Sequence, residues 1–265
     1  MATILRQLLS SVALALWFGA SASAQSAASA PAIAPPIAPS FALLSLVGDQ
    51  FSVVMRREEI GSHIDPNSRR IYPIDTAALD DIALGAAEDV LKKMRPVSPV
   101  VRFSIRDPRL FDLQDKLLVD SADSRGMREA LAKLLREHQV TRLVLVTKRR
   151  DEAQFKLVDG TTGTGKISGL GFYVDTTYQY LHPESGVRGE GFLGPFAYLS
   201  VSVVDVATMA PIRSVPARES EMKLPVDTKG AVHAWDALTA AGKVDALERV
   251  LRRGVAAATT AALAD

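Results

Sequence analysis

The sequence predicts a single domain of the α/β (α+β) class, in which a mixed sheet is flanked by helices. Strand and helix patterns alternate in the first half of the chain, a β-meander follows in the second half, and a long helix ends it. Amphipathic elements in this order bury their apolar sides when helices cover a shared sheet. We place this domain at residues 41–265.

The first 24 residues have the pattern of a secretory signal peptide. The base Arg6 precedes a short apolar run, Leu8–Phe18, and the small residues Ala22 and Ala24 mark a cleavage site. The run falls short of the about 20 apolar residues that a membrane-spanning helix needs. We therefore expect cleavage after Ala24 and a periplasmic or secreted protein with no membrane span in the mature chain. The alternative is an N-terminal anchor that stays uncleaved.

Residues 25–40 consist almost entirely of Ala, Pro and Ser. Such a segment cannot bury enough apolar surface to fold, and its prolines keep it extended. The sequence therefore predicts a disordered tether between the signal peptide and the domain.

The charge balance argues against nucleic-acid binding, and the absence of cysteine excludes disulfides and lipidation at a thiol. Loss of residues 1–24 removes a single base, so the mature chain has 30 basic and 30 acidic residues. A net charge of zero gives no general attraction for nucleic acid or for a membrane surface, so we expect no nucleic-acid partner. The chain contains no cysteine, so it forms no disulfide and offers no thiol for lipidation.

Two short strand patterns open the domain. They cover residues 41–47 and 50–57 on either side of the turn signal Gly48-Asp49, and they form either a hairpin or two separate strands. A turn-rich segment follows, with a short strand expected near Arg70–Tyr72. From Leu79 to Met94, apolar residues recur every three or four positions, which predicts a helix with one apolar stripe.

The next elements lead to the expected centre of the sheet. A strand is predicted over Pro99–Arg106 and a second amphipathic helix over Ser124–His138. The continuous apolar run Arg142–Thr147 is typical of a strand that is buried on both faces. Val144 and Leu145 should then be buried on opposite sides of the sheet.

The second half of the domain reads as a β-meander that ends in a helix. Strands are expected at Phe155–Val158, Lys166–Tyr180, 197–206 and 211–222, and the third of these alternates apolar and polar residues. The final helix is predicted by apolar residues at helical spacing: Val244, Leu247, Leu251, Val255, Ala258 and Ala262.

The stretch Gly160–Ser168 nearly matches the phosphate-binding loop G-x-x-x-x-G-K-[ST]. Ile167 stands where the magnesium-binding hydroxyl belongs, and the residues that follow are glycine, β-branched and aromatic types that do not start a helix. A phosphate loop depends on such a helix N-terminus. We interpret the stretch as a turn between two strands and expect no nucleotide and no other cofactor.

The sequence supports no catalytic or metal-binding motif. Ser220 and Lys223 match S-x-x-K, but Ser220 falls in an expected strand, whereas that chemistry places the serine at a helix N-terminus. No histidine is three or four residues from another; the four are His63, His138, His182 and His233. We therefore expect no metal ion and assign no catalytic residue.

A glycine-rich segment, Tyr180–Phe196, joins two expected strands and is longer than a hairpin requires. Apolar side chains on an adaptable loop suit docking to a protein partner, with charged residues setting the register at the rim. The predicted partner-binding residues are Arg188, Glu190, Phe192, Leu193 and Phe196. The competing interpretation folds the same segment onto its own sheet as a lid.

The strand end Val204–Ile212 resembles the pattern v-D-v-x-T-G-x-i, with Asp205 and Thr208 in place and Met209 where the pattern has glycine. Together with the helix at Ala77–Met94, the buried strand Val140–Val146 and the terminal helix, the chain resembles a periplasmic superfold. Its members include the curli secretion-pore lipoprotein, the amino-terminal domain of TolB and the lipoprotein activators of penicillin-binding proteins. The resemblance spans roughly residues 41–263 and implies a non-enzymatic assembly or scaffold role in the envelope.

These observations favour a secreted accessory domain that binds an envelope protein. Two alternatives stay open. One is an envelope hydrolase with a discontinuous active site, and the other is a binder of small ligands that uses Tyr173, Tyr178 and Tyr180 on one long strand.

Overall fold

The fold is given by a computed structural model that describes residues 38–56, 67–74, 76–105, 107–157, 160–181, 186, 188–225 and 233–264. The expected signal peptide and nearly all of the expected tether lie outside the described residues. The helices are α1 (Ala78–Met94), α2 (Pro108–Asp112), α3 (Ala122–Glu137) and α4 (Ala240–Leu263), with one 3-10 turn, η1 (Ala234–Ala237). In the described part of the chain, no helix is long and apolar enough to cross a membrane.

The strands form a mixed sheet, as predicted, with a separate small hairpin, β7–β8. In chain order they are β1 (Phe41–Ser45), β2 (Gln50–Met55), β3 (Ser68–Pro73), β4 (Val100–Phe103), β5 (Arg142–Lys148), β6 (Arg150–Glu152), β7 (Phe155–Leu157), β8 (Gly160–Thr162), β9 (Lys166–Leu181), β10 (Arg188–Asp205) and β11 (Ala210–Ser220). β9, β10 and β11 are the meander that the sequence predicts.

The long strand β10 organises the sheet. Its residues 199–205 pair with β5 and its residues 188–198 pair with β9, both antiparallel. β11 occupies the opposite edge of β10 over residues 196–205. Because a strand has only two edges, β5 and β9 must share the remaining one, and they lie end to end beside β10.

The strands β1 and β2 repeat this arrangement one position further out. β1 pairs parallel to β5, β2 pairs parallel to β9, and only residues 46–49 separate them. They are therefore two separate strands that follow one line rather than a hairpin. β4 flanks β1 and β3 flanks β2 at the outer edge. Two rows of the sheet are thus each made of two strands placed end to end, β5 with β9 and β1 with β2. We call the place where one strand ends and the next begins, residues 45–49 and 147–149, the seam.

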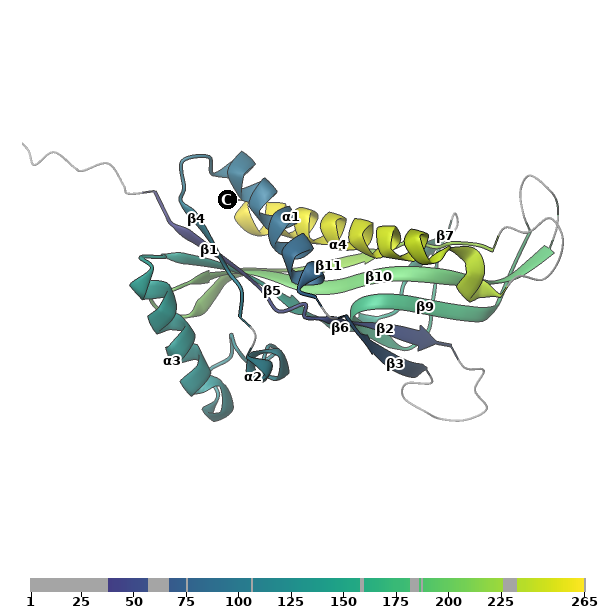
Figure 1. Cartoon of the computed structure of the whole chain (residues 1–265), viewed down its shortest axis with the longest axis horizontal. Coiled ribbons are helices and arrows are strands. Elements are labelled where there is room, and N and C mark those ends of the chain that lie inside the picture. Colours follow the sequence, from purple (N-terminus) through teal and green to yellow (C-terminus); the bar gives the residue numbers. More distant parts are fainter. Residues whose placement is uncertain are drawn as a thin grey trace, which may run out of the picture. The chain divides into compact units, whose positions relative to one another are not determined.

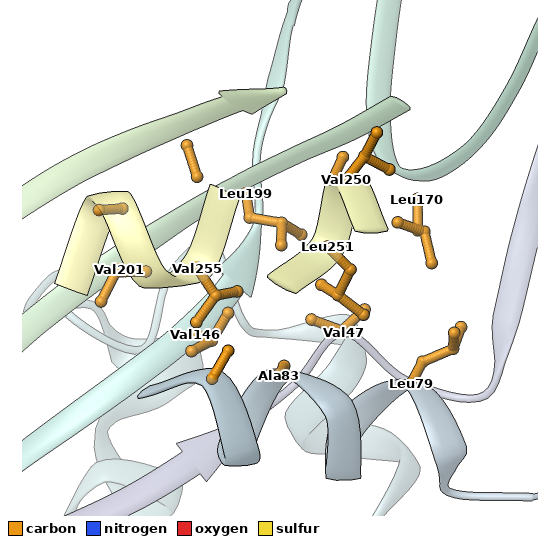
Figure 2. Close-up of a cluster of buried hydrophobic side chains, with 14 of the residues drawn as sticks. Val47, Leu79, Ala83, Val146, Leu170, Leu199, Val201, Val250, Leu251 and Val255 are labelled. Carbon is orange, nitrogen blue, oxygen red and sulfur yellow. The ribbon is translucent and has the colours of Figure 1, made fainter. Parts of the chain in front are cut away.

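One face of the sheet is covered by α1 and α4, which lie side by side across it (Figure 1). Both helices turn apolar stripes to the sheet, where they meet buried strand residues on both sides of the seam. Of the six residues that predicted α4, five are buried, but Val244 is 65% exposed, so the apolar stripe begins one turn later than predicted. Figure 2 shows this cluster, which includes Leu79, Ala83, Val250, Leu251 and Val255 from the helices and Val47, Val146, Leu170, Leu199 and Val201 from the sheet side.

The opposite face is covered in two parts. α3 packs Leu131 and Leu135 against the β1–β5 half, where Leu143 and Leu145 face it. The β7–β8 hairpin covers the β9 half, with Phe155 at the centre of an aromatic cluster. Val144 packs with the α1 and α4 cluster instead. The prediction that β5 is buried on both faces, with neighbouring residues on opposite sides, is confirmed.

The reversal between β10 and β11 contains the strand-end pattern that the sequence analysis identified. The Asp205 Oδ1 atom accepts hydrogen bonds from the backbone N–H groups of Ala207 and Thr208, at 2.9 and 3.2 Å. Met209 has a φ of 53°, a left-handed conformation that glycine adopts at lower cost. Its side chain is nevertheless buried in the α3 cluster, which offsets the backbone strain.

Charged side chains fasten α4 at its C-terminus and along its length. Arg95 and Arg213 donate hydrogen bonds to carbonyl groups of its last turn, where cations are favourable. Glu221, just after β11, accepts two hydrogen bonds from Arg249 of α4. These bonds, helped by Lys223 and opposed by burial, lower the pKa of the Glu221 carboxyl to about 2.

Replacement of Leu145 by alanine tests the central position of β5. The change should lower the free energy of unfolding by about 2–5 kcal/mol, because it removes transfer energy and leaves a cavity between the sheet and α3. Leu181→Ala provides the matched control, since Leu181 is 63% exposed, and should cost less than about 0.5 kcal/mol. Urea unfolding followed by circular dichroism measures both variants. Equal midpoints for the two would contradict the assignment.

Candidate functional site

The predicted partner-binding residues do not form an exposed loop. Residues 188–196 belong to β10, and Phe192, Leu193 and Phe196 are fully buried, so the expectation of exposed apolar side chains is wrong. Leu193 packs beneath the helices, while both phenylalanines join the aromatic cluster on the other face. Arg188 and Glu190 are exposed, on the same strand. The alternative, in which this segment packs onto its own sheet, is closer to the structure.

The glycines of this segment serve packing and a bulge. A Cβ atom on Gly194 would lie 2.3 Å from the ring of Phe155, so the aromatic cluster requires glycine there. Gly191 has a φ of 82° where the β9–β10 register shifts. The continuous apolar character of 191–199 was the available signal for a strand covered on both faces.

The other sequence-predicted candidates take part in strands or in internal hydrogen bonds. No helix follows Gly160–Lys166; its first residues form β8, and Ile167 is buried at the start of β9, as a turn between strands predicts. Tyr173 is buried, with its hydroxyl bound to Thr164, and the Tyr180 hydroxyl donates to the Pro225 carbonyl. Among the described residues, no group of three or more potential metal ligands is found.

Exposed apolar side chains lie on both faces of the two-stranded ribbon β2–β3. Three of the nine large hydrophobic residues that are exposed in the described part of the chain lie here: Met55 at 37%, Ile71 at 58% and Tyr72 at 40%. The Tyr72 ring stacks on Phe51 with 5.4 Å between centroids, and Phe51 in turn contacts Phe172 in the core. Tyr72 is therefore held on a rigid base, on the same face of the ribbon as Met55, whereas Ile71 projects from the opposite face.

At Ile71, the backbone N–H and C=O groups of β3 face away from β2. The Ile74 amide donates to the Asp49 carbonyl, which fixes the β2–β3 register. By alternation, the amide and carbonyl of Tyr72 face β2, and those of Ile71 face away from it. Pro73 also faces away, which suits a residue without an N–H group.

A second candidate is a cluster of polar side chains at the seam. The Ser45 hydroxyl donates to the Asp80 Oδ1 atom at 2.5 Å, and the Gly48 amide donates to the same oxygen at 3.1 Å. The Lys148 amide donates to the Gln114 side-chain oxygen at 2.7 Å. Where the strand lines change partner, these side chains replace missing ladder hydrogen bonds.

The acid and the amine at the seam are both perturbed. Burial raises the pKa of the Asp80 carboxyl, and the bonds from Ser45 and Gly48 only partly oppose it. Burial lowers the pKa of the Lys148 amine against the attraction of Asp80 and Asp49. An acid and a base shifted in this way are a recognised feature of reactive sites, although structural ion pairs also shift pKa values. No sequence motif identified these residues, because they come from four separated segments.

In comparisons with known proteins, no family model and no curated protein sequence matches this chain.

Two replacements at Asp80 separate its hydrogen-bonding role from its charge. Asp80→Ala leaves the Ser45 hydroxyl and the Gly48 amide without their acceptor, and should lower the free energy of unfolding by about 1–3 kcal/mol. Asp80→Asn keeps an acceptor oxygen and removes a buried charge, so it should cost less than about 1 kcal/mol.

The pH dependence follows from the sign of the shift. The folded-state pKa of Asp80 lies above its ordinary value of 3.8. Wild-type stability should therefore fall, relative to Asp80→Asn, as pH rises from 3.8 through the folded-state pKa, and the difference should then stay constant. Urea unfolding at a series of pH values checks this. A difference that does not vary with pH, or an asparagine variant as unstable as the alanine variant, would contradict it.

Proposed function

We propose that the chain is a secreted, periplasmic, non-enzymatic accessory domain that binds a protein partner of the cell envelope through the β2–β3 ribbon. The observation that carries this proposal is the exposure of Ile71 and Tyr72, which project from the two faces of one edge strand. Tyrosine is enriched at the energetic centres of protein interfaces, and the Tyr72 ring is held by its stacking on Phe51. The N-terminal signal pattern and the resemblance to envelope scaffold proteins support the location.

The other edges of the sheet are less suited to a partner. Pro216 faces outward on β11, as Pro73 does on β3. At the end of β11, however, Glu219 and Glu221 bind Arg253 and Arg249 of α4, so this edge is already in contact with its own helix. β4 has only four residues. The β3 edge combines an outward-facing amide at Ile71 with exposed apolar side chains, which is the combination that recognition by strand addition uses.

The alternative function, an enzyme or a small-ligand binder, has one observation in its favour. This is the perturbed acid and amine of Asp80 and Lys148 at the seam. The hydrogen bonds of Asp80 have a structural explanation, however, because they satisfy backbone and hydroxyl groups where the strand lines break. We therefore rank the partner-binding function first.

Photo-crosslinking at Ile71 tests the proposed surface, with Ile212 as a matched control. Both are isoleucines on edge strands with similar exposure, 58% and 56%. A photoreactive residue at position 71 should give one discrete protein adduct in envelope extracts, which unlabelled protein competes away and mass spectrometry identifies. Position 212 should give none.

Serine replacements complete that experiment. Ile71→Ser should abolish binding of the identified partner and Ile212→Ser should not, while each changes the free energy of unfolding by less than about 0.5 kcal/mol. Equal adducts at both positions, or partner binding that survives Ile71→Ser and Tyr72→Ser together, would rule out the ribbon as the contact surface.

The proposed location predicts the mature N-terminus. The intact mass of protein released from the periplasm should correspond to a chain that begins at Gln25, because the apolar run and the small residues before it fit signal-peptidase cleavage. Retention of residues 1–24 in a membrane fraction would instead support the uncleaved anchor.

A further inference from the structure

The two strands of the β2–β3 ribbon have a one-sided charge. β2 contains no charged residue, and β3 contains Arg69 and Arg70 but no acid. Both arginines are exposed. The formal charge of the whole chain is only +1, so the positive edge of the ribbon is a local feature that the overall composition does not explain.

Arg70 and Tyr72 are neighbours on one face of β3. Residues two positions apart along a strand point to the same side, and these two stand opposite Val53 and Phe51 of β2. The Tyr72 ring is held by its stacking on Phe51. In the described part of the chain, the Arg70 guanidinium has no hydrogen bond and no ion pair. This face of the edge therefore presents an anchored aromatic ring beside a cation that is available to a partner.

The backbone of the same edge determines how a guest strand would align. Ile71 directs its N–H and C=O groups away from β2, and Pro73 directs its carbonyl the same way. An antiparallel guest, the slightly more stable orientation per residue, would place one residue opposite Ile71 in a hydrogen-bonded pair. The two flanking guest residues would then stand opposite Arg70 and Tyr72, with their side chains on that face of the ribbon.

We propose that the partner supplies an extended acidic segment, which adds to β3 as an antiparallel strand with a carboxylate opposite Arg70 and an apolar side chain opposite Tyr72. The inference rests on the proposed function and names the chemistry of the partner at that site. Opposite charges on directly opposed residues stabilise a strand pair. A guanidinium also holds a carboxylate through two parallel hydrogen bonds, which gives the pairing a defined register.

A second copy of this chain fits the edge less well than an acidic segment does. Two paired β3 strands would bring four arginines together with no acid in the paired segments, because each strand contains Arg69 and Arg70. Like charges on neighbouring strands destabilise the pair, and charged side chains on an edge are a common protection against self-association. The charge of β3 therefore favours a partner of opposite charge.

A synthetic peptide tests strand addition on the mature protein. In acetyl-Thr-Thr-Val-Val-Glu-Thr-Thr-amide, the Val-Val-Glu run faces Tyr72, Ile71 and Arg70 in turn. Titrated to the millimolar range, it should shift the nuclear magnetic resonance signal of the Ile71 amide saturably and leave that of Ile212 unchanged. N-methylation of the second valine, whose amide faces β3, should abolish the shift, whereas N-methylation of the first valine, whose amide faces away, should not. Equal effects of the two modifications, or no shift at all, would overturn strand addition.

The acidic class is tested by one change in the peptide and two in the protein. Glutamine in place of the glutamate should weaken binding about two- to fivefold, the range expected for an exposed ion pair. Arg70→Ala should bring this ratio to one, and Arg188→Ala, at an exposed arginine of β10, should leave it unchanged. A ratio of one in the wild type, or a ratio that survives Arg70→Ala, would overturn the assignment of an acidic partner.

The result can be separated from the test of the proposed function. An envelope protein that crosslinks at position 71, without any shift from the peptide, would leave the ribbon as a contact surface and overturn strand addition by an acidic segment. A glutamate-dependent shift without an envelope adduct would support the peptide-binding edge and count against an envelope partner. A crosslink from position 71 to a second copy of the chain would overturn both.

Discussion

The hydrogen bonds that Asp80 and Gln114 supply at the seam replace those that two continuous strands would have made. Buried backbone N–H groups need an acceptor, and an unsatisfied one costs about 1–3 kcal/mol. Because β1 and β2 follow one line and β5 and β9 follow the next, both lines break at the same level. The first turn of α1 must therefore lie close enough for Asp80 to reach Gly48. That contact fixes α1 on the sheet, and α4 packs beside it.

The same constraint accounts for the shifted pKa values of Asp80 and Lys148 at the seam. A carboxyl group that satisfies buried backbone is itself desolvated, which raises its pKa, and burial of the Lys148 amine at the end of β5 lowers the pKa of that amine. The perturbed pair is thus a consequence of the way the sheet is assembled. The hydrogen bonds from Ser45 and Gly48 give the Asp80 carboxyl a structural role at the seam.

Local patterns were sufficient to predict the helices α1, α3 and α4 and the buried strand β5, since each depends on its own periodicity. The seam was not predictable, because no local signal says that β9 continues the line of β5. The five-residue helix α2 is too short to show a period. The glycines of β10 were misread for a related reason. Gly194 has to be glycine because Phe155, a distant residue, packs against it, and a flexible loop would use the same letter.

The edge strands β11 and β3 differ in what covers them, and this difference makes β3 the better site for a partner. At the end of β11, Glu219 and Glu221 bind arginines of α4, so this edge is held against its own helix. Along β3, by contrast, Ile71 and Tyr72 stay exposed although burial would stabilise them. Apolar surface held on a rigid, outward-facing edge has a cost in solubility, and a partner that covers it offsets that cost.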